Sequence, residues 1–300
     1  MARSFDLVDW KLAEADFFLK RISDCGHDFF AVRCNISAFI ASARSVTFAL
    51  QSCLSDADGF SEWYTKHQKR LKADPLAKFF HEFRRVNQHI GENPVAGGAD
   101  GPRRALYFFR PTPDIEIVPE EDVEMACRLY FRMVASIVFE CYEDFGPLID
   151  AKQRYTAEYY ASLGKTIEDA EEDALMPQVM TTIQAWSTLT GQTAPCENHD
   201  ELRKKLRGWT KVEGYSEEYR WQALRDGEAG CRVNYIFEEH LGKTVAEPLR
   251  LPNIEPPEGQ GWYRMKSGGR VYIPEELRKT GDPEKDLEAY IESLRVERSG

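Results

Sequence analysis

A long helical segment at residues 27–54 is the feature that most limits what this chain can fold into. It follows Gly26 and is dense in small side chains, namely Ala31, Ser37, Ala38, Ala41, Ser42, Ala43, Ser45 and Ala49. Small side chains at this density let another helix approach closely, either within the chain or across a dimer. The segment therefore predicts that the first half of the chain is built by helices packing on helices.

Further helices are expected on both sides of this segment. Residues 9–24 place Trp10, Ala13, Phe17 and Leu19 at roughly helical spacing, and residues 60–72 are typical of a shorter amphipathic helix. Asp74 followed by Pro75 is a strong helix start, because an aspartate N-cap and a proline at the first helical position both suit a helix N-terminus. We expect this helix to run to about Ile90.

Two short β runs, residues 105–110 and 114–118, are expected to form a small hairpin inserted between helices. Another long helix should begin near Pro119 and reach about Leu163, with a break near Gly146. This order of elements predicts a mainly α protein: an antiparallel helical bundle with a small inserted β-hairpin.

The second half of the chain is less regular. An acidic helix is expected at 167–187, and two or three shorter helices within 199–241. After a proline-rich stretch, two runs that flank Ser267-Gly268-Gly269 predict a second hairpin. Residues 283–297 predict a charged helix. We therefore expect three regions: a helical bundle at 1–165, a helical accessory region at 166–247, and a linker, β-hairpin and C-terminal helix at 248–300.

The charge of the chain is acidic overall but uneven. The 50 Asp and Glu residues outnumber the 39 Lys and Arg residues, which gives a formal net charge of −11. Such an excess argues against a protein whose whole surface binds nucleic acid. Residues 61–91 are the exception, because seven Lys and Arg side chains accompany only three acids there. A small basic site on an acidic protein is therefore expected.

Composition also limits the class of protein. Hydrophobic residues make up 42% and charged residues 30% of the chain, a mixture typical of globular proteins. No run approaches the roughly 18 apolar residues of a transmembrane helix, and the N-terminus lacks the apolar core of a signal peptide. Seven scattered cysteines are best explained as reduced thiols. We therefore expect a cytoplasmic protein without a membrane partner.

Motifs for metals and cofactors are incomplete. Gly164-Lys165-Thr166 and Gly242-Lys243-Thr244 lack the earlier glycine of a phosphate-binding loop. Cys196 and His199 have metal-ligand spacing, but no second pair follows them. We expect neither a metal nor a cofactor.

The helix at 75–90 carries the candidate site. Its apolar stripe consists of Phe79, Phe83, Val86 and Ile90, with Asn87 on the same side. The opposite arc holds cations and imidazoles, namely His81, Arg85, Gln88 and His89, with Arg84 at its edge. A histidine can take a proton from a ribose hydroxyl, and an arginine one turn away can hold the scissile phosphate. Arg44, among the small side chains, either pairs with a carboxylate or reaches the same site.

The run from Arg84 to His89 resembles the Arg-x4-6-His motif of the HEPN superfamily, and its surroundings FFHEFRRVNQHIGENPV and SAFIASARSVTFALQ resemble bacterial members of that group. The resemblance covers at most residues 9–163. It implies a helical, typically dimeric domain and a metal-independent ribonuclease of the toxin–antitoxin or phage-defence kind. Arg84 and His89 would then be the catalytic pair, supported by Asn87, Arg85 and Arg44.

Several functions remain open at this point. The first is an endoribonuclease that acts on RNA at a homodimer interface. The second is a catalytically inactive helical module that binds a protein partner, for which residues 201–225 would matter more. The third is small-molecule or nucleotide binding within the bundle. An Arg and a His on an exposed helix face can also be no more than solvated surface.

Overall fold

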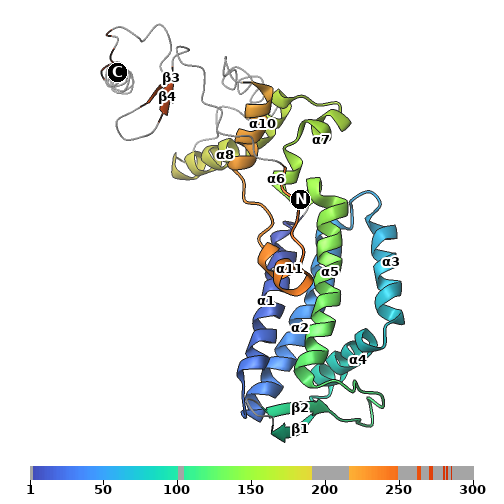
Figure 1. Ribbon diagram of the computed structural model, residues 1–300. Helices are drawn as coiled ribbons and strands as arrows, with labels where there is room; N and C mark the ends of the chain where they lie inside the picture. Colours follow the sequence, from blue (N-terminus) through green and yellow to red (C-terminus); the bar gives the residue numbers. More distant parts are fainter. Residues whose placement is uncertain are drawn as a thin grey trace. The chain divides into compact units, whose positions relative to one another are not determined.

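The computed structural model (Figure 1) describes residues 3–100, 105–190 and 216–248, the short strands at 262–264 and 270–272, and residues 280, 282 and 285. The chain is mainly helical, as expected. It divides into two compact units: unit 1 comprises residues 1–154 and 229–247, and unit 2 comprises residues 155–228 and 248–300. In the described part, no helix combines the length and the apolarity needed to cross a membrane.

Unit 1 is a helical bundle. Its long helices α1, α2 and α5 lie side by side, and α3 and α4 lie beside them (Figure 1). The bounds are Asp6–Asp24 for α1, Phe29–Leu54 for α2, Phe60–Ala73 for α3, Pro75–His89 for α4 and Val123–Ile149 for α5. The small-residue helix packs chiefly against α1, so a close helix pair does form within the chain.

Aspartate N-caps define where these helices begin. Asp28 accepts a hydrogen bond from the backbone N–H of Ala31 at 2.9 Å, and Asp74 accepts one from Ala77 at 2.9 Å. Each bond satisfies one N–H group that the first helical turn leaves without a partner. Asp122 caps α5 in the same way, so that helix begins at Val123 rather than at Pro119. The sharp connection at Asp74 sets the direction of α4 relative to α3.

The expected hairpin is wrong, because residues 105–110 do not pair with residues 114–118 as strands. Strand β2, Ala105–Phe109, pairs antiparallel with β1, Val95–Asp100. Residues 114–118 contribute only one isolated bridge, between Thr112 and Ile115. Strand β1 was not expected from the sequence because its glycines have low β propensity. The pairing with β2 nevertheless requires a glycine in this strand. A Cβ on Gly98 would collide with the backbone carbonyl of Leu106.

The face of α1 that packs into the core of unit 1 is not the one that carries Trp10 and Phe17, the aromatic residues expected there from the sequence. The buried apolar side chains of α1 are Val8, Leu12, Ala15, Leu19 and Ile22, at spacings of three and four residues. Trp10 and Phe17 lie on the other side, 69% and 54% exposed. At the end of α4, Ile90 is likewise 58% exposed, although Phe79, Phe83 and Val86 are buried as expected.

The long helix expected up to Leu163 is interrupted in the expected region. Phe145 has non-helical backbone angles inside α5, just before Pro147. Proline removes a backbone donor and crowds the preceding turn, so a kink follows. Two short helices continue the chain: α6, Ala151–Arg154, in unit 1 and α7, Ala157–Ser162, in unit 2.

Unit 2 contains α8, Ile167–Thr190, and α10, Glu217–Asp226. Arg220 joins them by ion pairs with Glu168 and Glu171, at 3.1 and 2.7 Å. The expected hairpin near the C-terminus is confirmed, since β3, Trp262–Arg264, pairs antiparallel with β4, Arg270–Tyr272. Its turn, the expected helices within 199–215 and the charged helix at 283–297 lie outside the described residues.

The compact units differ from the regions expected at 1–165, 166–247 and 248–300. The first unit ends at Arg154, and residues 229–247 belong to it. Within that segment, α11, Asn234–Leu241, packs against α5 and contributes Ile236 and Phe237 to the core. A later piece of sequence thus completes the first bundle, which no local composition signal indicates.

Candidate functional site

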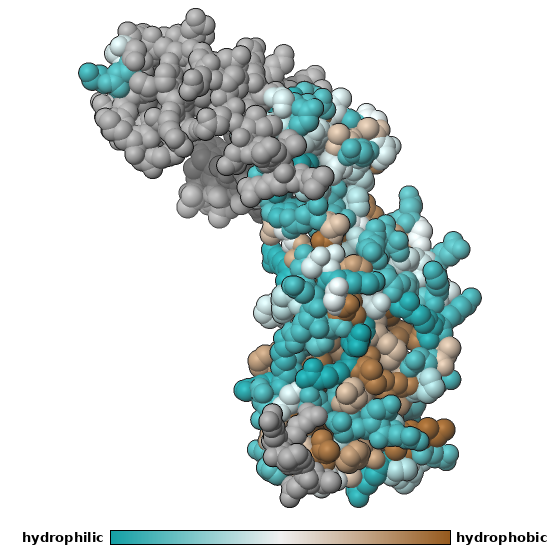
Figure 2. All heavy atoms as spheres, in the orientation of Figure 1, coloured by the Kyte–Doolittle hydropathy of each residue, from teal (hydrophilic) through white to brown (hydrophobic). Residues whose placement is uncertain are grey.

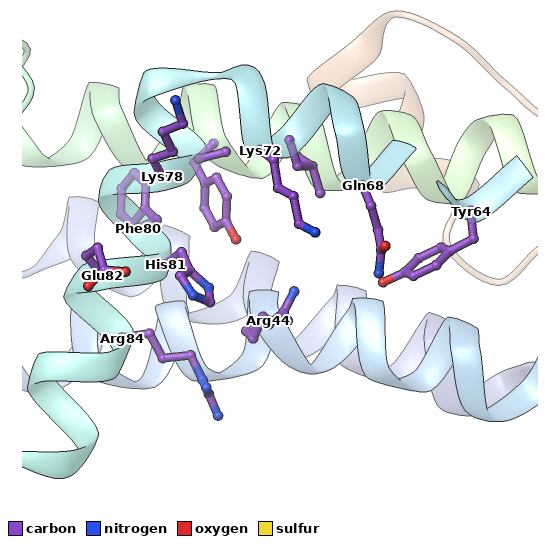
Figure 3. Close-up of a pocket in the computed structure, with 12 residues that line it drawn as sticks. Arg44, Tyr64, Gln68, Lys72, Lys78, Phe80, His81, Glu82 and Arg84 are labelled. Atoms are coloured by element: carbon purple, nitrogen blue, oxygen red, sulfur yellow. The ribbon is translucent and has the colours of Figure 1, made fainter. Parts of the chain in front are cut away.

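A pocket of about 410 Å³ lies in unit 1 where α2, α3, α4 and α5 meet. Figure 3 shows Arg44, Lys72 and His81 pointing toward one another across it, while Arg84 reaches from α4 to α2. Figure 2 shows hydrophobic side chains at the surface of this part of the bundle. The lining residues are Arg44 from α2, Tyr64, Gln68, Leu71 and Lys72 from α3, Ala77, Lys78, Phe80, His81, Glu82 and Arg84 from α4, and Tyr130 from α5.

The pocket carries excess positive charge. Four lining side chains are cationic, and Glu82 is the one acid among the lining residues. The Glu82 carboxylate is engaged by Arg85, whose Nε lies 2.8 Å from Oε2, and this hydrogen bond raises the pKa of Arg85. Little negative charge remains to neutralise the pocket, so it favours an anion.

Arg44 and Arg84 are the two partly buried cations of the pocket, whereas Lys72 and Lys78 are exposed. The Nε atom of each is buried and has no hydrogen-bond partner. In the part of the chain that the structure describes, no carboxylate oxygen lies within 4.0 Å of either guanidinium. Arg44 donates from Nη1 to Thr47 Oγ1 at 3.0 Å. Both guanidinium groups lie over the ring of Phe48, with centroid distances of 4.5 Å for Arg44 and 5.8 Å for Arg84.

A buried donor without a partner costs about 1–3 kcal/mol, and such groups are uncommon in native proteins. Cation–π contact with Phe48 offsets part of this cost but supplies no acceptor. Two guanidinium groups that line one pocket suit an oxyanion such as phosphate or carboxylate as their acceptor.

Tyr130 provides the neutral side of the pocket. Burial raises the pKa of its phenol to about 12, although Arg44 and Arg84 act to lower it. The hydroxyl therefore stays protonated at neutral pH and can donate a hydrogen bond. Its ring stacks on Phe80 with centroids 4.5 Å apart, and the two rings form an apolar wall.

The expected pair of Arg84 and His89 is not brought together. Arg84 lines the pocket, whereas His89 is the exposed last residue of α4 and does not. Five residues correspond to about 140° of helical rotation, so the two side chains leave α4 in different directions. His81, three residues before Arg84, is the histidine that shares the pocket with it.

The three residues expected to support the catalytic pair, Arg85, Asn87 and Arg44, lie in different surroundings. Arg85 is exposed and bound to Glu82. Asn87 donates from Nδ2 to the carbonyl of Glu92 at 3.2 Å, a contact that holds the chain after α4. Arg44 lies in the pocket itself, so of the two roles considered for it the structure favours reaching the site over pairing with a carboxylate.

Most of the lining residues were not among the site residues expected from the sequence, and Lys72, Lys78 and Tyr130 are three that bear on the chemistry of the pocket. Lys72 and Lys78 were visible only as part of the basic stretch at 61–91. Tyr130 carried no signal, because it lies in an apolar segment of α5 far from the other residues in sequence. Only the packing of α5 against α4 brings it to Arg44 and Arg84.

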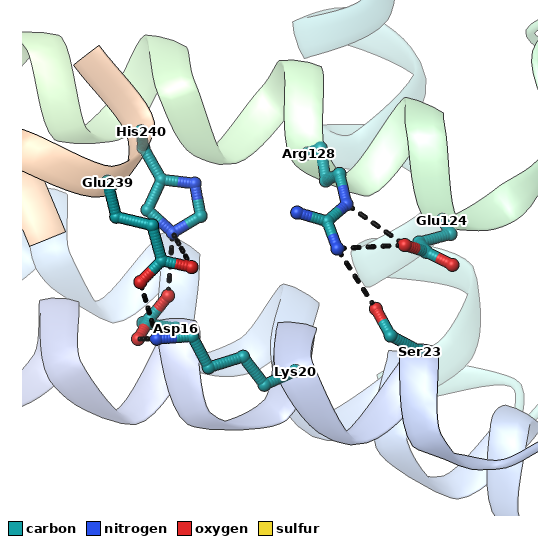
Figure 4. A network of polar contacts seen from close by, with 7 residues as sticks. All are labelled: Asp16, Lys20, Ser23, Glu124, Arg128, Glu239 and His240. Carbon is teal, nitrogen blue, oxygen red and sulfur yellow. Dashed lines mark hydrogen bonds and ion pairs between the residues drawn. The ribbon is translucent and has the colours of Figure 1, made fainter. Parts of the chain in front are cut away.

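A second polar cluster joins α1 to α11 (Figure 4). His240 Nε2 lies 2.8 Å from Asp16 Oδ1, and Glu239 lies near both, so the three side chains could hold a metal ion. Lys20 takes that place: its Nζ lies 2.9 Å from Asp16 and 2.7 Å from Glu239. Burial would raise the pKa of Asp16, but the hydrogen bonds from His240 and Lys20 outweigh it and lower the pKa. We interpret the cluster as a structural link.

Replacing His240 by alanine should lower the free energy of unfolding of unit 1 by about 2 kcal/mol, because the buried Asp16 carboxylate then keeps only Lys20 as a partner. Urea unfolding of the full chain measures this. His89→Ala is the matched control, since that histidine is exposed and should change stability by less than about 0.5 kcal/mol. Equal losses in the two variants would contradict the link.

Three of the four helices that line the pocket, α2 to α4, fall in the part of the chain that matches a known family. Residues 5–92 match the family model of bacteriophage lambda protein ea47. The chain is similar to that family over α1 to α4, which supply all the cationic residues of the pocket. No curated protein and no solved structure matches the chain.

The resemblance to the HEPN superfamily is therefore wrong. The family model that covers Arg84 and His89 is that of the phage protein, and no HEPN family matches. The motif that suggested HEPN consists of two residue types at one spacing, which occurs by chance on many amphipathic helices.

Proposed function

We propose that unit 1 binds a phosphate-bearing small molecule in the pocket between α2, α3, α4 and α5. The observation that carries this proposal is the pair of partly buried arginines, Arg44 and Arg84, which line the pocket and have no carboxylate within 4.0 Å among the described residues. A phosphate oxyanion supplies several strong acceptors and is bound well by arginine forks. Lys72 and Lys78 add charge without adding a competing acid.

The remainder of the pocket supports an organic group attached to the phosphate. Leu71, Ala77 and Phe80 line it together with the ring of Tyr130, so part of the wall is apolar. Its volume of about 410 Å³ is within the range of small-molecule sites. Gln68 and the Tyr130 hydroxyl offer neutral hydrogen bonds. A nucleotide combines these properties: a phosphate, polar edges and a flat apolar ring.

The expected endoribonuclease activity stays a prediction. The pocket supports the part of it that requires a phosphate to be held by Arg84. An acid–base step would need a histidine at the phosphate, and the residue suitably placed for that is His81 rather than His89. The alternative of a protein-binding module at 201–225 falls largely outside the described residues. We retain a cytoplasmic location, supported by the free state of the cysteines in the described part.

Replacing Arg44 by glutamine should weaken binding of adenosine 5′-monophosphate by about tenfold or more, because a charge-assisted hydrogen bond contributes about 1.5–3 kcal/mol. Lys72→Gln should weaken it by a smaller factor. Isothermal titration calorimetry on the full chain measures both affinities. Adenosine and inorganic pyrophosphate, titrated separately, divide the affinity between the organic group and the phosphate.

Two controls remove the same charge outside the pocket. Arg33 is an exposed arginine of α2, and Lys69 is an exposed lysine one turn before Lys72 on α3. Arg33→Gln and Lys69→Gln should leave the affinity unchanged. If neither phosphate compound binds at millimolar concentration, or if the controls weaken binding as much as the pocket variants do, the proposal is wrong.

A further inference from the structure

Helix α1 exposes an apolar face on the side opposite the core. Trp10 and Phe17 are both more than half exposed, and Leu7 next to them is 47% exposed. Large aromatic side chains are seldom left in water at such density on one helix without a partner. The face is separate from the basic pocket, which is built by α2 to α5.

Helix α11 extends this face into a groove. A hollow of about 320 Å³ lies between α1 and the start of α11. Its apolar lining comes from Leu7, Trp10 and Ala13 on one side and from Val233 and Tyr235 on the other. Its rim carries an exposed ion pair, in which Arg232 Nε lies 3.6 Å from Asp6 Oδ1. Apolar floor and charged rim are the usual composition of a protein interface.

The order of side chains along α1 is complementary to itself. Asp6, Trp10, Ala13, Phe17 and Arg21 project within an arc of about 80° on the helix. When two such helices pack antiparallel about a point between Ala13 and Glu14, Trp10 of each copy meets Phe17 of the other. Asp6 of each copy then meets Arg21 of the other. The small Ala13 next to the axis lets the two helices approach closely.

From this order of charges and aromatic rings we infer that the face of α1, flanked by α11, binds a second copy of the same chain as a two-fold symmetric dimer. The chain carries a formal net charge of −11, which opposes self-association in general. On this face, however, the acids have cationic partners: Glu14 is paired with Lys11 of its own helix and Asp6 with Arg232, and Asp6 also faces Arg21 of the second copy. A two-fold axis requires such a self-complementary surface.

The molar mass of the full chain in solution tests the dimer. Light scattering after size exclusion should give twice the chain mass for the parent protein. Phe17→Asp should give the monomer mass, because it buries a carboxylate against Trp10 of the partner copy. The matched control is Phe30→Asp, at an aromatic residue of α2 that is 77% exposed and outside this face. It should keep the dimer mass.

Charge reversal tests the antiparallel register. Asp6→Lys alone should place two cations opposite each other at both ends of the interface and raise the dimer dissociation constant by about tenfold or more. Combining Asp6→Lys with Arg21→Glu should restore the parent dissociation constant. A monomeric parent protein, a dimeric Phe17→Asp variant, a monomeric Phe30→Asp variant, or a double variant no tighter than Asp6→Lys would each overturn the inference.

Discussion

Replacing Phe39 by alanine should lower the free energy of unfolding of unit 1 by about 3–5 kcal/mol. Phe39 is fully buried on α2 at the meeting point of three helices. Its ring lies 6.2 Å from that of Phe80 on α4 and 6.4 Å from those of Tyr130 and Phe131 on α5. The variant loses the transfer free energy of the ring and leaves a cavity that rigid helices fill only in part. Urea unfolding of the full chain measures the loss.

The same substitution should weaken phosphate binding. Phe80 and Tyr130 line the pocket and rest on Phe39, so both can shift into the cavity and carry the Tyr130 hydroxyl away from Arg44 and Arg84. Phe30→Ala is the control, because that side chain is exposed and should cost less than about 0.5 kcal/mol. A Phe39→Ala loss below about 1 kcal/mol would show that the three helices do not pack through this ring.

Replacing Asp9 by asparagine should stabilise unit 1 at neutral pH, by up to about 3 kcal/mol. Asp9 is buried on α1, and the hydroxyl of Tyr142 donates to its carboxyl group, with distances of 2.9 and 2.8 Å to the two oxygens. Burial raises the pKa of Asp9 from 3.8 to about 6. Above pH 6 the fold therefore holds an unfavourable buried charge, which asparagine removes while its carbonyl still accepts from Tyr142.

The sign of this effect depends on pH in a defined way. Because the folded-state pKa of Asp9 exceeds the unfolded value, its contribution to the free energy of unfolding is complete below pH 4 and is lost as the pH rises to about 6. The difference between Asp9→Asn and the parent should therefore be small at pH 4 and largest above pH 6. Urea unfolding at both pH values measures it. A constant difference across this range would show that Asp9 is not buried in its charged form.

Asp16 on the same helix should behave in the opposite sense. Its pKa is lowered on balance by His240 and Lys20, so its contribution to stability is present above the unfolded pKa and is lost in acid. Asp16→Asn should therefore destabilise at neutral pH where Asp9→Asn stabilises. The two buried aspartates lie seven residues apart but have different partners. Asp16 has Lys20 one turn along α1 and His240 from α11, whereas Asp9 has the neutral hydroxyl of Tyr142.

Local features of the fold were predictable because their causes are local. Asp74 and Pro75 marked the start of α4, since the capping oxygen and the N–H that it binds are three residues apart. The pairing of β2 was not predictable in the same way. Its partner strand is a glycine-rich run with low β propensity, selected because the close approach of Leu106 leaves no room for a side chain at Gly98.

The candidate site was likewise predictable in part. The basic stretch at 61–91 predicted a local positive site, and Lys72, Lys78, His81 and Arg84 all come from it. The choice of histidine was not predictable from spacing alone, because His81 and His89 both lie near Arg84 in sequence. The crossing of α4 over α2 decides that His81 enters the pocket and that His89 does not.

By itself, the sequence determined that this protein is mainly helical, where α3 and α4 begin, and that positive charge gathers on these two helices. These properties follow from interactions within a few residues: capping, helical periodicity and charge density. Only the tertiary structure decided that Arg44 and Tyr130 join Arg84 in one pocket, that α11 completes the first bundle, and that Trp10 and Phe17 face outward. These properties depend on which helix faces pack together, and that choice minimises the exposed apolar area of the whole unit rather than of any one segment.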